Sequence, residues 1–255
     1  MIVALAAMTR SGPEPVGAFR RLDMNTLHRH VGSIAAAVAL STVVLPMTVS
    51  AAENGRFEKL SVYLERNVQD RDAEIRFEVS GAKEGLTALK VLAPGERTVI
   101  DIRTPDSKLG IRQLTTESPE PDDDRVVRAD FPAGTYRFEG KTTKGTTLRD
   151  EARLSHVFPE PAAFEYPRSG QKDVPYTALT LRWSMPADIE SCALVIEQDG
   201  SRYEIRALLP GSTKSFTIPE GFLRAGQVYT LAIGTVAKDG NRSFIEGSFT
   251  TARAR

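Results

Sequence analysis

The chain has 255 residues, enough for one large or two ordinary domains, and its 33 basic residues balance 33 acidic ones. Hydrophobic residues make up 41% of the sequence, a share that is ordinary for a soluble globular protein. This balance argues against a nucleic-acid partner and against binding to an anionic membrane surface.

The first part of the chain carries the pattern of an export signal. A short, mildly basic lead after Met24 is followed by an uncharged run rich in Ala and Val, residues 31–45, and by small residues at 49–52. These features are typical of a secretory signal peptide, and the apolar run is shorter than the roughly 20 residues of a membrane span. We expect residues 24–52 to be a cleaved signal and residues 1–23 to be an upstream extension, with Met24 as the true start. An uncleaved N-terminal anchor and a buried N-terminal helix are the alternatives.

Removal of the first 52 residues would leave a nearly neutral protein. The segment holds four basic and two acidic residues, so 33 − 4 = 29 basic and 33 − 2 = 31 acidic residues would remain, a net charge of −2. Cys192 is the only cysteine, so an exported form has no internal disulfide and its stability must come from a buried core. On its strand-like run Cys192 is expected to be a small buried hydrophobic residue.

Residues 53–158 are predicted to form a β-sandwich of no assigned type. Apolar and polar residues alternate at period two between breaks rich in Gly, Pro, Asp and Asn, and no window shows the 3.6-residue period over a helical length. Residues 131–138 place a Pro-x-Gly turn before an aromatic strand, a phrase that resembles the entry to a late strand in many secreted bacterial β-sandwiches. Residues 118–124 are expected to be an exposed loop. The expected strands cover residues 60–64, 75–79, 86–92, 98–103, 109–114, a run around 136–138, and 149–155.

A short proline-rich linker, residues 159–161, separates this half from a second predicted sandwich over residues 162–255. Pro159 and Pro161 favour an extended, semi-rigid spacer. Strand-like runs follow at residues 179–183, 192–196, 203–206, 216–218, 229–233 and 249–251. The predicted fold is therefore all-β, with two tandem β-sandwich domains.

The second half resembles the fibronectin type III domains over about residues 162–251. Trp183 matches the tryptophan of their second strand, Leu223 and Tyr229 match the leucine and tyrosine of the corner between their fifth and sixth strands, and residues 239–243 resemble the turn before their last strand. The third strand departs from the family, because it carries Cys192 and a leucine where that family usually has a tyrosine. The resemblance implies a sandwich with structural roles for Trp183, Leu223 and Tyr229, and no fixed ligand-binding residues.

Few residues suggest catalysis or metal binding. The mature chain would hold one histidine, His156, for which we expect a structural place at the domain junction rather than the role of a general base. No nucleophile elbow, phosphate loop or dinucleotide fingerprint is present, and no cofactor is expected. The one dense carboxylate cluster, Asp122, Asp123 and Asp124, is a weak calcium candidate and more simply a solvated acidic loop.

Surface aromatic residues are the other candidate site. Tyr63 lies opposite the apolar face of its strand, and Tyr166 and Tyr176 flank the prolines of the first edge strand of the second sandwich. Exposed aromatic residues can stack on sugar rings or anchor a protein interface. Asn241 begins a glycosylation sequon, which matters only in a eukaryotic secretory pathway.

These features predict an exported, non-enzymatic binding or interaction protein in the periplasm or outside the cell of a bacterium. Its partner would be an envelope or extracellular protein, or a glycan, with no nucleic acid and no membrane span after signal cleavage. A carbohydrate-binding accessory module is the alternative, and a hydrolase is the second alternative. We expect clustered tyrosines to favour the glycan, a broad apolar patch to favour a protein, and a carboxylate-lined cleft to favour the enzyme.

Overall fold

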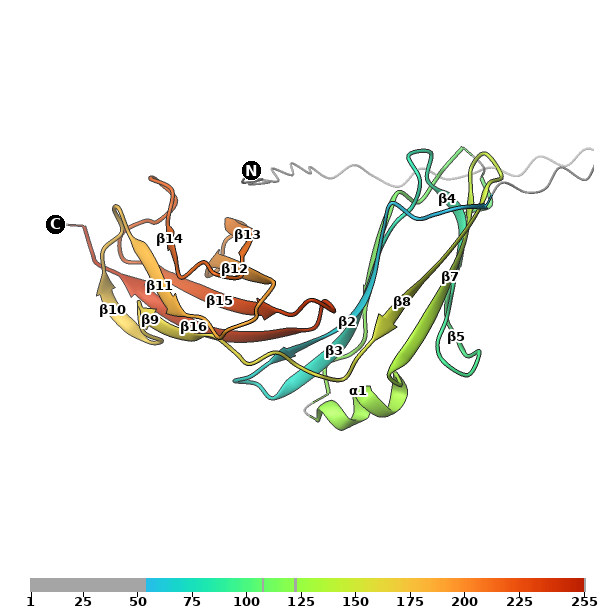
Figure 1. Cartoon of the computed structure of the whole chain (residues 1–255). Helices are drawn as coiled ribbons and strands as arrows, with labels where there is room; N and C mark the ends of the chain where they lie inside the picture. Colours follow the sequence, from blue (N-terminus) through green and yellow to red (C-terminus); the bar gives the residue numbers. More distant parts are fainter. Residues whose placement is uncertain (1–53, 107, 122, 255) are drawn as a thin grey trace, which may run out of the picture. The chain divides into compact units, whose positions relative to one another are not determined.

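The computed structural model describes residues 54–106, 108–121 and 123–254 (Figure 1). The predicted signal peptide and upstream extension lie outside these residues. The described chain forms sixteen strands and one short helix, which confirms the all-β prediction. Within this part of the chain, no helix is long and apolar enough to cross a membrane.

The first sandwich has seven main strands. They are β2 (Lys59–Asn67), β3 (Asp72–Ser80), β4 (Leu86–Leu92), β5 (Thr98–Arg103), β6 (Gln113–Glu117), β7 (Gly134–Thr142) and β8 (Thr147–Leu154), preceded by the short β1 (Asn54–Gly55). The first, second and fifth of the seven form one sheet, in the order β2-β3-β6. The other four form the opposite sheet, in the order β5-β4-β7-β8, and β1 runs parallel to β8 at its edge.

The core of the first sandwich lies between these two sheets. Val62 and Leu64 project inward from β2, and Phe77 from β3 meets Tyr136 from β7 edge to face, with ring centroids 5.8 Å apart. Phe138, two residues farther along β7, is fully buried in the same core. This inward set alternates with polar residues along each strand, which is the period-two pattern of a half-buried sheet.

A short helix, α1 (Asp124–Asp130), precedes β7 where the sequence pattern predicts no helix. Its seven residues make two turns, so a helical period cannot be recognised over so short a segment. Asp123 caps it, with its carboxylate accepting a hydrogen bond from the Arg125 N–H at 3.0 Å, and Val127 alone anchors it in the core. The predicted exposed loop therefore ends in a helix cap.

The second sandwich also has seven main strands. They are β9 (Ala163–Tyr166), β11 (Thr180–Ser184), β12 (Ser191–Gln198), β13 (Glu204–Pro210), β14 (Ser215–Thr217), β15 (Val228–Val236) and β16 (Arg242–Thr251), with the short β10 (Gln171–Val174) between the first two. The first, second and fifth again form one sheet, and the other four form the opposite sheet in the order β13-β12-β15-β16. The short β10 runs parallel to β16. Both sandwiches therefore have the same strand order.

Trp183 lies at the centre of the second core. It projects from β11 and is fully buried, among residues that include Leu194, Ile196 and Leu231. Cys192 is also fully buried, as expected, and burial raises the pKa of its thiol to about 12. Because a thiol with so high a pKa remains protonated at neutral pH, Cys192 is a packing residue rather than a nucleophile.

Each sandwich closes the same corner with a tyrosine at the start of its sixth strand. The Tyr229 hydroxyl accepts a hydrogen bond from the Arg224 N–H at 2.8 Å, and the Tyr136 hydroxyl donates one to the Pro132 carbonyl at 3.1 Å. A hydroxyl that bonds back to the chain a few residues upstream is the tyrosine corner of immunoglobulin-like sandwiches. The first sandwich therefore shares this device as well as the strand order of the second.

The two sandwiches are joined by strand pairing. β16, the last strand of the second, runs parallel to β2, the first strand of the first, with Arg242 opposite Glu65 and Phe244 opposite Asn67 (Figure 1). The Val68 N–H extends the pairing by donating to the Phe244 carbonyl at 2.9 Å. One eight-stranded sheet thus contains a seven-strand path from β13 through β16 and β2 to β6, with β10 as its eighth strand beside β16.

Candidate binding groove

Asn241, just before β16, fastens the joint between the sandwiches. Its side chain is 1% exposed, and its Oδ1 accepts a hydrogen bond from the Leu64 N–H at 2.8 Å. Its Nδ2 lies within 3.1 Å of the Ser155 carbonyl and hydroxyl and 2.9 Å from the Val157 carbonyl. Asn241 begins a glycosylation sequon, but its buried Nδ2 is not available for glycosylation in the folded protein.

Tyr63 is buried in the same joint, so the expectation that it is exposed is wrong. Only 1% of it is accessible, because the turn at Gly240 and the side chain of Arg242 cover its ring, with the guanidinium carbon 4.1 Å from the ring centre. Its hydroxyl donates to the Glu78 carboxylate at 2.6 Å. The face opposite the first core is thus partly an interface between the sandwiches rather than free surface.

The linker is held against this joint as well. Arg66 donates to the Ser243 hydroxyl at 2.8 Å and to the Pro159 carbonyl at 3.3 Å, and its guanidinium lies 4.7 Å from the centre of the Phe158 ring. The Ser243 hydroxyl in turn donates to the Pro159 carbonyl at 2.7 Å. These contacts fix the backbone on both sides of the β2–β16 pairing.

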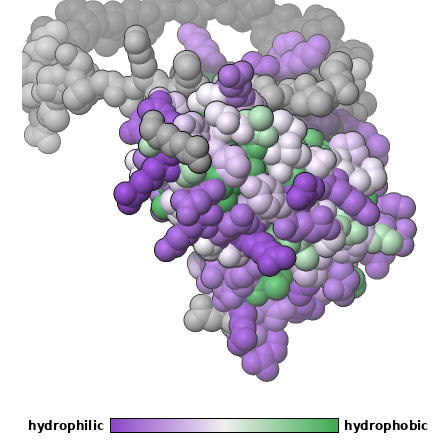
Figure 2. Space-filling model, turned by 90° about the vertical axis from the view of Figure 1, so that its left-hand side faces the viewer, coloured by the Kyte–Doolittle hydropathy of each residue, from purple (hydrophilic) through white to green (hydrophobic). Residues whose placement is uncertain are grey.

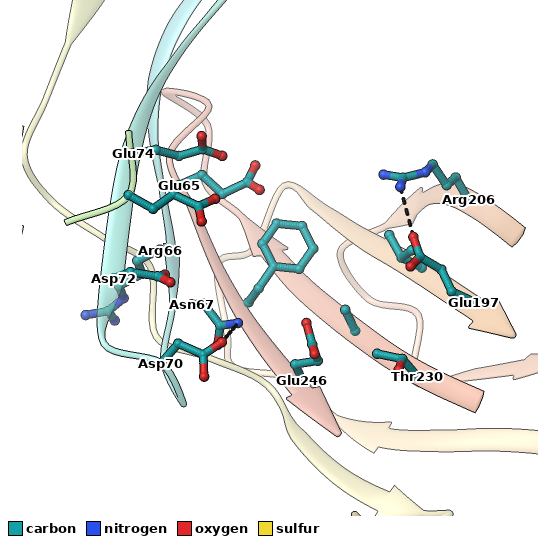
Figure 3. Close-up of a pocket in the computed structure, with 14 residues that line it drawn as sticks. Glu65, Arg66, Asn67, Asp70, Asp72, Glu74, Glu197, Arg206, Thr230 and Glu246 are labelled. Atoms are coloured by element: carbon teal, nitrogen blue, oxygen red, sulfur yellow. Dashed lines mark hydrogen bonds and ion pairs between the residues drawn. The ribbon is translucent and has the colours of Figure 1, made fainter. Parts of the chain in front are cut away.

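A groove lies on the polar face of the continuous sheet beside this joint. It has a volume of about 340 Å³ and is lined by β2 and β3 from the first sandwich and by β12, β13, β15 and β16 from the second. Figure 3 shows Glu65 and Glu74 projecting toward it from one side, and Glu197 with Arg206 on the other. Phe244 is its one aromatic lining residue. Seven lining residues are acidic: Glu65, Asp70, Asp72, Glu74, Glu120, Glu197 and Glu246.

Of the residues that the structure describes, two basic side chains, Arg66 and Arg206, line this acidic groove, so the formal charge of the lining is 2 − 7 = −5. Both are already engaged. Arg66 bonds to the linker, and Arg206 pairs with Glu197 and Glu204, each at 3.0 Å. Arg76 pairs with Glu65 and Glu74, and Arg242 pairs with Glu65, from outside the lining. The negative charge without a basic ion-pair partner among the described residues is therefore that of Asp70, Asp72, Glu120 and Glu246.

Glu74 is the most perturbed carboxyl of the groove. It is 4% exposed, and burial raises its pKa to about 7, aided by the charges of Glu65, Glu117 and Glu120 and opposed by Arg76. Its Oε1 accepts a hydrogen bond from Arg76 at 3.1 Å, whereas its buried Oε2 has no partner among the described residues.

Glu65 stands directly opposite Glu74 on the neighbouring strand. Burial raises the pKa of Glu65, and Arg242 and Arg76, which contact its carboxylate at 3.4 Å, oppose that rise. Glu246 also has a raised pKa, from burial and from the nearby charges of Asp70, Glu197 and Asp72. The groove therefore crowds carboxylates whose mutual repulsion a cationic ligand would relieve.

The strand order, Trp183 on the second strand and the corner at Tyr229 place the second sandwich in the predicted class. Residues 162–251 are fibronectin type III-like. Leu223, the other corner residue, is buried in the core of this sandwich. Fibronectin-like folds host many unrelated functions, so the groove, and not the fold, must carry the functional argument.

Comparison with known proteins adds little. No protein-family model matches the sequence, and no curated protein matches it. Similar solved structures include a segment of two fibronectin type III domains from chicken tenascin (13% identity, 77% of this chain and 100% of that chain, TM-score 0.30). They also include fibronectin(III)-like modules of Clostridium thermocellum CbhA (10%, 77% and 96%, TM-score 0.31) and the FN1–FN3 domains of chicken CNTN1 (11%, 78% and 66%, TM-score 0.30).

Asp123 and Asp124 of the acidic triplet are not among the residues that line the groove. Asp122 falls outside the described residues, Asp123 caps α1 and pairs with Arg125 at 2.7 Å, and Asp124 pairs with Arg128 at 2.7 Å. In the described chain no group of three or more His, Cys, Asp or Glu residues is arranged to hold a metal ion. The carboxylates of Asp123 and Asp124 therefore stabilise the first turn of α1.

The remaining candidates are also apart from the groove. Tyr166 and Tyr176 are half-buried against the second core, and Arg182 lies 5.3 Å from the centre of the Tyr166 ring. His156 sits at the junction, with its Nε2 2.9 Å from the Phe131 carbonyl. None of these three side chains is among the residues that line the groove.

Proposed function

We propose that the protein is an exported, non-enzymatic binding protein of the cell envelope or extracellular space, and that it binds its ligand in the acidic groove. The observation that carries this proposal is a concave polar surface assembled from both sandwiches and fixed by the β2–β16 pairing and by Asn241. A rigid site between two domains is a common place for a ligand. Its volume of about 340 Å³ fits a short segment or a small molecule.

Surface chemistry favours a polar ligand over a large apolar partner. Hydrophobic residues form only small, separate areas on the face drawn in Figure 2. The most exposed large hydrophobic side chains of the described chain are dispersed, with Leu109 in the first sandwich, Val157 just before the linker and Leu208 on β13. The glycan alternative has less support, because Tyr63 is buried and Phe244 alone offers an aromatic ring to the groove.

A hydrolase remains the second candidate on one observation. Glu74, with its pKa raised to about 7, stands opposite Glu65, and a protonated carboxyl beside another carboxyl is the pairing that glycoside hydrolases use. Against catalysis, one nitrogen of Arg76 contacts both carboxylates, so they are tied together as a structural ion pair.

The proposed function is tested by capture. Mature wild-type protein and the Glu74→Gln and Glu246→Gln variants are immobilised and exposed to envelope extract, with Glu220→Gln, an exposed carboxylate outside the groove, as the matched control. We expect a ligand that wild type and Glu220→Gln retain and the groove variants lose. Equal capture by all four proteins would place the binding surface elsewhere. Hydrolysis of a glycan that Glu74→Gln abolishes would establish the enzyme instead.

A further inference from the structure

We propose that the ligand of the acidic groove is an extended basic peptide segment, whose guanidinium or ammonium groups pair with carboxylates on both walls. This inference rests on the proposed function and names the chemistry of its ligand. Three observations carry it: the charge of the groove, the unpartnered oxygen of Glu74 and the spread of the carboxylates.

The charge of the groove is local rather than general. The residues that line the groove carry a formal −5, which becomes −5 + 2 = −3 when Arg76 and Arg242 are included, while the mature chain as a whole carries −2. Among the described residues no basic side chain forms an ion pair with Asp70, Asp72, Glu120 or Glu246. A cationic ligand supplies the missing counter-charge where the two walls focus the field.

Glu74 adds an observation independent of this charge. Its side chain lines the groove and points toward it in Figure 3, is more than nine-tenths buried, and leaves Oε2 without a hydrogen-bond donor. A buried carboxylate oxygen that accepts no hydrogen bond loses its hydration without compensation, which destabilises the folded protein. An entering guanidinium or ammonium group provides that donor.

The arrangement favours an extended ligand over a single metal ion. Calcium needs six to eight oxygens at about 2.3–2.6 Å around one point, and no described trio of acidic residues converges in that way. Instead the carboxylates run from Glu74 on β3 to Glu197 on β12, which are four strand spacings apart in the sheet. Four spacings amount to about 19 Å, the length of about six residues of extended peptide.

The experiment measures binding of a capped hexa-arginine peptide to the mature protein by calorimetry, with hexaglutamate and calcium chloride as comparison ligands. Wild type should bind hexa-arginine, with affinity falling as salt is added, and should bind hexaglutamate not at all. Glu74→Gln should weaken binding about tenfold, because a charge-assisted hydrogen bond is lost. Glu246→Gln, at the exposed rim, should weaken it about two- to fivefold, and the control Glu220→Gln should leave it unchanged.

Proton release gives a readout specific to Glu74. The groups that face this carboxyl are Glu65 on β2, Arg76 on β3, Glu117 on β6, and Glu120. A bound cation lowers the pKa of Glu74, so binding near pH 7 should release protons, detected by titration in buffers of different ionisation enthalpy. Glu74→Gln should remove this release, and circular dichroism should show all variants folded.

Each other outcome overturns the peptide assignment. Equal affinity of hexa-arginine for all variants means that it binds outside the groove. Calcium that binds alone, is weakened by the groove variants and displaces the peptide means that the site takes a metal ion. If hexa-arginine does not bind while capture from envelope extract still depends on Glu74 and Glu246, the ligand class is wrong and the proposed function stands. If both fail, the proposed function fails as well.

Discussion

The two sandwiches share one strand order and the same tyrosine corner, yet their outer faces differ. In the first, the sheet formed by β2, β3 and β6 carries buried charges on its outer side, with Glu74 4% exposed and Arg76 paired to three carboxylates. In the second, the corresponding sheet shows an ordinary solvent face, on which Thr180 and Arg182 alternate with buried residues. The two sandwiches therefore build their cores on the same strand order, but the residues on their outer faces decide where a ligand can bind.

The largest expected effect tests whether the two cores are equivalent. Trp183→Ala in the second core and Phe138→Ala in the first should each destabilise their sandwich by about 3–5 kcal/mol, because both side chains are fully buried and leave a cavity. Urea unfolding followed by circular dichroism measures the loss. Wild-type Trp183 should show blue-shifted fluorescence resistant to acrylamide, since it is the only tryptophan. Stability changes within about 0.5 kcal/mol would contradict the burial of either residue.

The second prediction separates the cores from the joint. Asn241→Ala should destabilise the full chain by about 2–4 kcal/mol, because it leaves the buried Leu64 N–H without a partner and removes the hydrogen bonds to the Ser155 and Val157 carbonyls. Those partners belong to the first sandwich. In fragment 162–255 alone, the same substitution should therefore change stability by less than about 0.5 kcal/mol.

This test requires fragments 53–158 and 162–255 each to fold alone, as we predict from their separate sets of core residues. Proton NMR spectra of the two fragments are the measurement. An unfolded spectrum from either fragment, beside an ordered full chain, would show that the joint is part of one folding unit rather than a contact between two.

The third prediction concerns the charged outer face of the first sandwich. The pKa of Glu74 rises from 4.5 in the unfolded chain to about 7 in the folded protein, so the folded state holds its proton more tightly. Stability from this group is complete below pH 4.5 and is lost as pH rises to about 7, a loss of about 2–3 kcal/mol. Urea unfolding at pH 5, 6, 7 and 8 measures it. Glu74→Gln should flatten the profile, and an equally steep profile in that variant would assign the slope to other groups.

The smallest expected effect compares the two corners. Tyr229→Phe removes the acceptor of the Arg224 N–H and should cost about 1–2 kcal/mol, whereas Tyr136→Phe leaves only the Pro132 carbonyl without its donor and should cost about 0.5–1.5 kcal/mol. Chemical unfolding of the two variants in parallel provides the measurement. A larger loss at Tyr136 would show that the first corner is the more important closure.

Sequence patterns predicted the cores well because each strand shows its inward face by alternation. Val62 and Leu64 on β2 are inward as predicted, and Trp183 is buried in the second core. The tyrosine corner of the first sandwich is also visible in the sequence. An Ala-Gly pair precedes each corner tyrosine, with its glycine two residues before Tyr136 and three residues before Tyr229. These two short sequences indicate that the two corners correspond, whereas the common strand order is visible only in the structure.

The groove could not be predicted, because it depends on a contact between distant segments. Glu65 and Glu246 lie 181 positions apart in the sequence, and nothing local indicates that β2 and β16 pair. The same contact explains why Tyr63 was expected on the surface. Its strand places it opposite the first core, and only the second sandwich covers it. The one local signal was the density of charged residues on the outer face of β2 and β3.

Because β2 pairs with β16, the first strand of the first sandwich has to wait for its partner while the rest of the chain is synthesised. A chain that emerges N-terminus first exposes β2 long before its partner exists, since Leu64 and Asn241 are 177 residues apart. At about 5–20 residues per second, the stretch of some 90 residues from the linker to β16 takes about 5–20 s to appear. During that time the edge of β2 is open to pairing with other chains, and the charged side chains of Glu65 and Arg66 are the kind of protection that such an edge requires.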